Sequence, residues 1–204
     1  MKKGTKIVGL ILAAVLLMSA SVFGTLAYLK DATKVVTNTF TVGKVDIELD
    51  ETNINDTTTT DARTKNGNSY KRVPASTYQK DPVVHVQPQS EASYLFIYVK
   101  NEIAAYEETT DTSLPTIDQQ IQQRNWTVLD ATNFPGVYYQ AVPANTNTGV
   151  ANDYPVFVQF SIAKNADFTN FTSNETVKIM AAAVQQQGLT YTQAWSEVKT
   201  YFGL

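Results

Sequence analysis

Few residues of this chain have types that could do chemistry. The sequence holds one histidine, His85, and no cysteine. A zinc site needs several His or Cys ligands, and a Ser–His–Asp triad needs a recognisable nucleophile turn, and neither pattern occurs. His85 lies in an apolar run between Pro82 and Pro88, which is typical of a short strand. We therefore interpret His85 as a structural residue and expect no catalytic residue, metal or cofactor.

Carboxylates gather after the first predicted strand, which raises the question of a calcium site. They are Asp50, Glu51, Asp56 and Asp61. Calcium loops need oxygen ligands at fixed short intervals with a glycine at the turn, and this register is absent. We predict a long exposed loop over 50–69 without a bound ion.

Three aromatic residues, Trp126, Tyr138 and Tyr139, could line a sugar-binding surface. The same residues belong to a predicted hairpin, where they would pack against the core. Packing is the interpretation that we prefer.

The charge balance argues against nucleic acid as a partner. The chain has 16 basic and 19 acidic residues, and three of the lysines lie in the first six positions. Removal of residues 1–27 leaves 13 basic and 19 acidic residues, a net charge of −6. Binding to phosphates depends largely on cationic side chains. The lack of cysteine also excludes disulfides, so an ordinary core must supply the stability.

The N-terminus has the pattern of an export signal. Three lysines precede the apolar run Ile7–Met18, and Thr25 and Ala27 place small residues at positions −3 and −1 before Tyr28. We predict a helical signal peptide over 1–27, cut before Tyr28. The alternative is an uncleaved anchor, because the uncharged stretch from Ile7 to Leu29 is long enough to cross a bilayer. Contact with a membrane is expected only through the uncleaved signal.

The mature chain opens with a segment, 28–42, whose apolar residues change parity at its end. Val36, Phe40 and Val42 occupy even positions, whereas the apolar positions beyond Gly43 are odd: Val45, Ile47 and Leu49. Side chains of a strand alternate between its faces, so a parity change at a glycine indicates either a bulge in one strand or a hinge between two. The hinge interpretation makes 28–42 a separate segment and 43–204 the folded domain.

The rest of the chain predicts short strands with two helices. Strands are expected at 83–87, 94–100, 155–162 and 177–185, with a hairpin formed by 126–129 and 136–142. Residues 177–185 fit a helix as well as a strand by pattern alone. Helices are expected at 116–124 and at 190–202, where Tyr191, Trp195, Val198 and Phe202 form one stripe.

Several of these stretches resemble a known family. GTLAYLKD with NTFTVGKVDIEL, the phrase YKRVPASTYQKDPVVHV, and WTVLD with GVYYQAV are similar to segments of the TasA/camelysin family. Its members are Gram-positive exported proteins, cut by a SipW-type signal peptidase, and some build biofilm-matrix fibres. The resemblance implies a strand at 177–185 and an all-β, jelly-roll-like β-sandwich with one or two short helices. It also implies secretion to the cell surface or extracellular matrix.

Three functions follow as hypotheses. The first is a structural protein that assembles head-to-tail with copies of itself into fibres. In this hypothesis the segment 28–42, with Val36, Phe40, Val42 and Gly43, completes the sheet of a neighbour after cleavage. The second is a monomeric cell-surface adhesin. The third is a secreted metallopeptidase of the camelysin type, which the missing zinc ligands disfavour.

Overall fold

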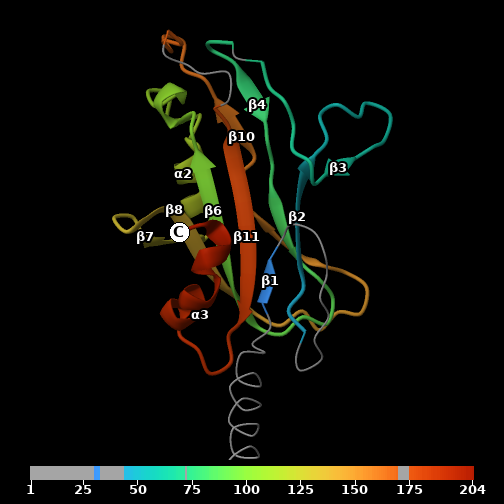
Figure 1. The fold of residues 1–204 in the computed structure, drawn as a ribbon. Helices are drawn as coiled ribbons and strands as arrows, with labels where there is room; N and C mark the ends of the chain where they lie inside the picture. The colour runs from blue at the N-terminus through green and yellow to red at the C-terminus, as the bar shows by residue number, and fades with distance from the viewer. Residues whose placement is uncertain (1–29, 33–43, 72, 170–174) are drawn as a thin grey trace, which may run out of the picture.

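A computed structural model describes residues 30–32, 44–71, 73–169 and 175–204 (Figure 1). In these residues the chain is mostly β-sheet with two short α-helices, which confirms the predicted fold class at this level. The predicted signal peptide, 1–27, lies outside the described residues.

Two antiparallel sheets and a small β-ribbon contain the described strands. The first sheet has five strands, in the order β1 (Lys30–Ala32), β11 (Val177–Gln185), β6 (Ser93–Asn101), β8 (Phe134–Val142) and β7 (Thr127–Asp130). The second has four, in the order β3 (Arg63–Thr64), β2 (Ile47–Thr52), β5 (Val83–Val86) and β9 (Asn152–Pro155). The ribbon pairs β10 (Gln159–Ser161) with β4 (Thr77–Gln79).

The main core lies between the two sheets. The second sheet contributes Ile47, Val84 and Val86, and the first contributes Leu95 and Ile97 among others. Along β2 and the residues before it, Val45 and Ile47 are buried and Leu49 packs against the same core, as the odd-position pattern predicted.

A second apolar cluster lies on the other face of the five-stranded sheet, beneath α3 (Tyr191–Val198). Trp195, Val198 and Phe202 are buried there, and Tyr191, although 38% exposed, stacks on Tyr139 of β8, so all four residues of the predicted stripe face the sheet. The α-helix is shorter than predicted, because its last turn tightens into a 3₁₀-helix at Lys199–Phe202.

The second helix, α2 (Ile117–Gln123), begins as its sequence predicts. The Thr116 side chain accepts a hydrogen bond from the backbone N–H of Gln119, and Gln119 caps the Thr116 N–H in return. Ile117 and Ile121 are fully buried. A 3₁₀-turn, Ala104–Tyr106, precedes this helix in the chain.

The predicted strand at 155–162 is wrong, because the chain leaves one sheet and joins another within it. Pro155 ends β9 opposite Val83 of β5, and Gln159 begins β10 opposite Gln79 of β4. Between them Val156 and Phe157 are both fully buried, so strict alternation is broken there. Val158 is 41% exposed, although it shares the even positions of the buried Val156 and Phe160. β9 itself begins at Asn152, before the predicted start of the strand.

The predicted exposed loop at 50–69 is wrong at its first residues and interrupted further on. Asp50 to Thr52 continue β2, and Arg63–Thr64 form β3 against it. Glu51 is buried, because it meets a cation from another segment of the chain. Hairpin formation by 126–129 and 136–142 is confirmed, with a register shift between Val128 and Asp130.

None of the helices in the described ranges is long and apolar enough to span a membrane.

Candidate functional site

The residues predicted to direct cleavage and assembly fall outside the described part of the chain. They are Thr25, Ala27 and Tyr28 for cleavage, and Val36, Phe40, Val42 and Gly43 for assembly. The structure therefore bears on assembly only through Lys30–Ala32 and through the sheet edge that those residues meet.

Lys30–Ala32 form β1 and pair within their own chain. Lys30, Asp31 and Ala32 lie opposite Val184, Ala183 and Ala182 of β11. Figure 1 shows β1 beside the end of β11 that leads to α3. Part of the predicted donor segment thus occupies an edge of its own subunit.

β1 covers only a part of this edge. Within the described residues, Val177 to Met180 of β11 have β6 on one side and no strand on the other. Val177 and Ile179 are partly buried against the inter-sheet core, and Met180 is partly buried against the α3 cluster. Among the described residues this stretch of β11 has no second partner strand, and it lies between two partly covered apolar faces.

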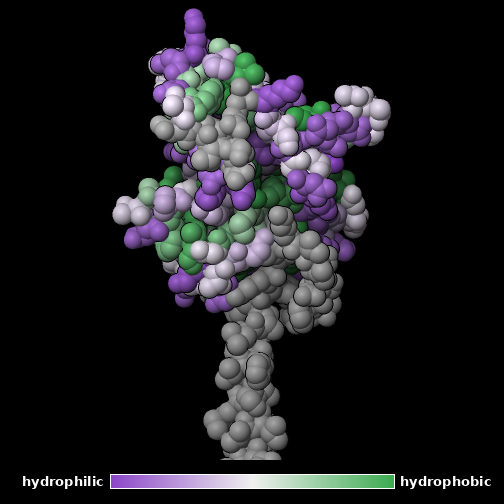
Figure 2. Space-filling model, turned by 45° about the horizontal axis from the view of Figure 1, so that its top comes forward, coloured by the Kyte–Doolittle hydropathy of each residue, from purple (hydrophilic) through white to green (hydrophobic). Residues whose placement is uncertain are grey.

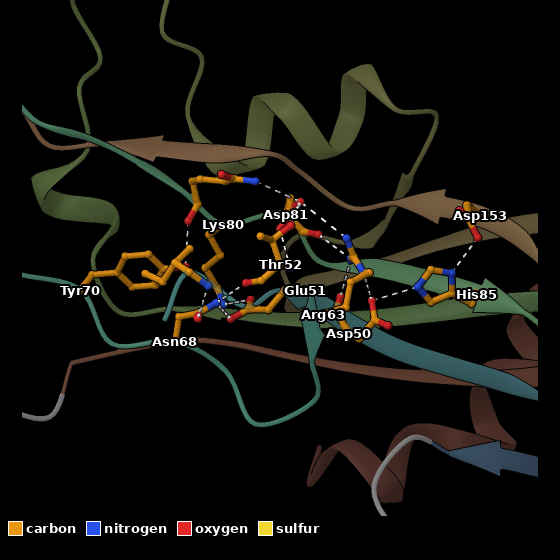
Figure 3. A network of polar contacts seen from close by, with 12 residues as sticks. Asp50, Glu51, Thr52, Arg63, Asn68, Tyr70, Lys80, Asp81, His85 and Asp153 are labelled. Carbon is orange, nitrogen blue, oxygen red and sulfur yellow. Dashed lines mark hydrogen bonds and ion pairs between the residues drawn. The ribbon is translucent and has the colours of Figure 1, made fainter. Parts of the chain in front are cut away.

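His85 lies on the outer face of the four-stranded sheet, between two carboxylates (Figure 3). Its Nδ1 lies 2.6 Å from Asp153 Oδ1, and its Nε2 lies 2.9 Å from Asp50 Oδ1. Burial lowers the pKa of His85, but the hydrogen bonds to Asp50 and Asp153, together with their charges, raise it above the usual value of 6.5. Only the imidazolium form can donate to both carboxylates at once.

Arg63 also pairs with Asp50, the carboxylate that lies beside His85 Nε2. Arg63 Nε donates to Asp50 Oδ1, and one Arg63 Nη donates to the Asp50 backbone oxygen at 3.2 Å. Asp81 accepts from the backbone N–H and the hydroxyl of Thr52 at 2.8 and 2.7 Å. His85 is therefore one member of a network that joins β2, β3, β5 and β9, which agrees with a structural role.

A second polar group lies deeper in the fold, where Glu51 meets Lys80. Their side chains form an ion pair and are only 6% and 7% exposed. The other oxygen of Glu51, Oε1, accepts a hydrogen bond from Asn68 Nδ2 at 2.8 Å. One buried carboxylate thus bridges an amine and a carboxamide (Figure 3).

The chain brings Asn68 to this place through a glycine turn. Gly67 has a φ of +74°, a conformation that favours glycine, and a β-carbon there would lie 3.9 Å from Glu51 Oε1. Asn68 Nδ2 also donates to the Thr52 carbonyl at 2.7 Å, and the Ile54 N–H donates to Asn68 Oδ1 at 3.1 Å. Both polar atoms of the Asn68 carboxamide, Oδ1 and Nδ2, therefore have hydrogen-bond partners.

Aromatic side chains flank the buried ion pair. Tyr70 and Tyr78 each pack on Phe160, with ring centroids 5.2 and 5.1 Å apart. Burial, and next the charge of Glu51, raise the pKa of Tyr70. A cavity of about 260 Å³ lies beside these rings, and Asn68 and Lys80 also line it.

The sequence contained a signal for this group that the loop prediction missed. Glu51 shares the odd positions of Ile47 and Leu49, so strand alternation directs it inward once β2 extends that far. Lys80 likewise shares even positions with the buried Val84 and Val86. No pattern along the chain indicated Asn68.

Metal and sugar sites find little support in the described residues. Within them no group of three or more His, Asp or Glu side chains is placed to hold a metal ion. Trp126 and Tyr138 are 2% and 3% exposed, with hydrogen bonds to the Pro155 carbonyl and to Asp118. Trp126 and Tyr138 therefore pack inside the protein, as we preferred, and the partly buried Tyr139 packs between Phe96 and Tyr191.

The described surface offers no large apolar patch in the view of Figure 2, where hydrophobic residues emerge in small, separate areas. The large hydrophobic residues that are exposed lie far apart in the sequence, as Ile54, Val73, Val150 and Val158 illustrate. Such scattered residues need no partner to explain them.

Comparison with known proteins finds no match among family models, curated proteins or solved structures.

Proposed function

We propose that this chain is an exported structural protein whose mature form assembles head-to-tail into surface or matrix fibres. Residues 28–42 would act as the donor strand and the edge of β11 as the acceptor. We further propose that the sandwich is of the jelly-roll type and that the signal is cut before Tyr28 by a SipW-type peptidase.

The observation that carries the proposal is the pairing of β1 with β11, because this edge accepts a strand from the segment 28–42. Within the described residues, β1 lies opposite three of the nine residues of β11. A backbone hydrogen bond contributes about 1 kcal/mol net, so a donor that pairs along more of β11 is held more firmly. A longer donor from another subunit that also pairs with Val177 to Met180 would form more bonds and displace β1.

The pattern of the donor segment suits this edge. Val36, Phe40 and Val42 share one parity, and alternate apolar side chains are what a strand needs to extend a half-covered core. The contact joins different surfaces of two subunits, and a heterologous contact that does not close forms an open filament.

Cleavage would control when this exchange takes place. With the cut before Tyr28, β1 begins two residues after the new N-terminus. Before the cut, the same residues are tethered to the signal and cannot reach a neighbour freely. Assembly is thereby restricted to the exported protein.

The adhesin and the peptidase are the other hypotheses that follow from the sequence. No particular feature of the described residues favours either, and the adhesin hypothesis predicts a mature protein that stays monomeric.

Electron microscopy of purified 28–204 tests the proposal directly, with filaments as the expected result. Deletion of 28–42, or the pair Phe40→Asp and Val42→Asp, should leave a folded monomer without filaments. The matched control is Thr39→Asp with Thr41→Asp, which adds the same charge on the other face of the segment and should retain assembly.

Two results would contradict the proposal. If the Phe40→Asp, Val42→Asp variant formed filaments as readily as the wild type, the face that carries Phe40 and Val42 would not be used in assembly. Loss of folding on deletion of 28–42 would make the segment an internal strand and Gly43 a simple bulge.

A further inference from the structure

We propose that Lys80 and Asn68 become joined by a covalent amide bond, formed within the folded chain with Glu51 as the proton carrier. Lys80 would be the nucleophile and the Asn68 carboxamide the acceptor. The reaction needs no other reactant and releases ammonia.

The arrangement of the three side chains carries this inference. Glu51 Oε2 accepts from Lys80 Nζ, and Glu51 Oε1 accepts from Asn68 Nδ2 at 2.8 Å. The two nitrogens therefore lie side by side on the two oxygens of one carboxylate (Figure 3). Such fixed proximity replaces a bimolecular encounter by an intramolecular one, which lowers the barrier to acyl transfer.

The hydrogen bonds to the Asn68 carboxamide also favour attack by a nucleophile on its Cγ atom. The Ile54 N–H donates to Asn68 Oδ1 at 3.1 Å, where negative charge develops when a nucleophile attacks Cγ. The Thr52 carbonyl accepts from Nδ2 at 2.7 Å and prevents rotation of the group. Aromatic rings, Tyr70 and Phe160 among them, line the cavity beside these side chains.

The steps balance in atoms and charge. Lys80 passes one proton to Glu51 and becomes a neutral amine. The amine attacks Asn68 Cγ, and the Nζ–Cγ bond forms. Glu51 then carries a proton to Nδ2, the Cγ–Nδ2 bond breaks, and the nitrogen departs as ammonia, which takes the second lysine proton and leaves as ammonium. Glu51 ends as the carboxylate with which it began.

The bond would have a structural use in a chain without cysteine. It closes the stretch between Asn68 and Lys80, which includes the exposed residues Lys71 and Val73. A cross-link restricts the unfolded chain, and this one would also hold both parts together after a cut in the loop. The bond forms within one subunit, so it does not depend on fibre assembly.

Peptide mapping of the exported wild-type protein tests the inference. The full chain, denatured and digested with trypsin, should yield peptide 66–71 joined to peptide 73–100, since trypsin does not cut after an acylated Lys80. The joined mass should be lower than the sum of the two by about 17 Da, the mass of ammonia. Because each digest fragment is identified separately, removal of the signal does not affect the result.

Variants define the role of each residue. Lys80→Arg, Asn68→Ala and Glu51→Gln should each abolish the joined peptide, whereas Asn66→Ala in the same turn should retain it. Recovery of folded wild-type protein with free peptides 66–71 and 73–80 would overturn the inference, whatever the variants do. A joined peptide that contains 45–63 and has lost about 18 Da, the mass of water, would assign the bond to Glu51 and overturn it as well.

Discussion

The Glu51 carboxylate and the Lys80 ammonium form an ion pair whose two side chains are 6% and 7% exposed. The removal of one partner from a buried pair leaves the other charge without compensation, which costs about 3–5 kcal/mol. Exposed pairs contribute much less, about 0–1 kcal/mol. The Glu51–Lys80 and Glu48–Lys65 pairs allow this difference to be measured in an Asn68→Ala background, where Lys80 has no carboxamide to react with and keeps its charge.

Glu51→Ala should therefore lower the free energy of unfolding by several kcal/mol, as measured by urea denaturation. Glu48→Ala, which breaks the exposed pair with Lys65, is the control and should cost about 1 kcal/mol or less. The double change Glu51→Leu with Lys80→Met should restore much of the loss, because it removes both charges. Equal costs for Glu51→Ala and Glu48→Ala would contradict the buried-pair account.

His85 should make stability depend on pH. Its folded pKa is raised above 6.5, so its pairing stabilises the protein fully below that value, and this contribution is lost as pH rises through the folded pKa. The difference in unfolding free energy between the wild type and His85→Gln should accordingly be largest near pH 6 and shrink toward pH 9.

Charged side chains from the neighbouring strands β2, β3 and β9 lie around His85. Asp50 comes from β2 and Asp153 from β9, Glu48 lies opposite His85 on β2, and Arg63 from β3 binds Asp50. The imidazole can be titrated directly by NMR, where a midpoint at or below 6.5 would contradict the prediction. Asp153→Asn should lower that midpoint, because it removes one of the two carboxylates.

Cleavage should remove residues 1–27. Intact mass measurement of the exported protein should give a chain that begins at Tyr28. Ala27→Asp should block the cut, because a charged side chain replaces the small residue at position −1. Full-length wild-type chain retained in the membrane would instead support the uncleaved anchor.

A disulfide lock at the sheet edge should prevent donor exchange. Ala32 and Ala182 are direct partners of β1 and β11, and the chain has no cysteine of its own. Oxidised Ala32→Cys, Ala182→Cys protein should stay monomeric in electron micrographs, and reduction should restore filaments. Each single cysteine variant serves as control and should assemble. Filaments from fully oxidised protein would exclude exchange of β1 as the route of assembly.

Zinc should affect neither folding nor proteolysis, because a single histidine cannot build an ordinary zinc site. Thermal unfolding and a casein cleavage assay, each with added zinc and with a chelator, check this. Chelator-sensitive cleavage that is lost in His85→Ala would revive the peptidase hypothesis.

Local sequence signals predicted much of the secondary structure. Thr116 and Thr190 begin helices as capping residues, and the odd-position pattern of Val45 and Ile47 is reflected in their burial. These features depend on neighbours within a few positions, so the order of residue types is sufficient to predict them. The mostly-β class follows from the same periodicities.

Contacts between distant segments decided the rest. Val158 is exposed because it lies where the chain leaves β9 and enters β10, and the buried Glu51 depends on a lysine 29 positions away. The sequence determined which side chains exist and, within an unbroken strand, which of them share a face. Only the tertiary structure determined that Glu51, Asn68 and Lys80 share one buried place, because strand pairing and loop closure, which no local pattern encodes, bring them together.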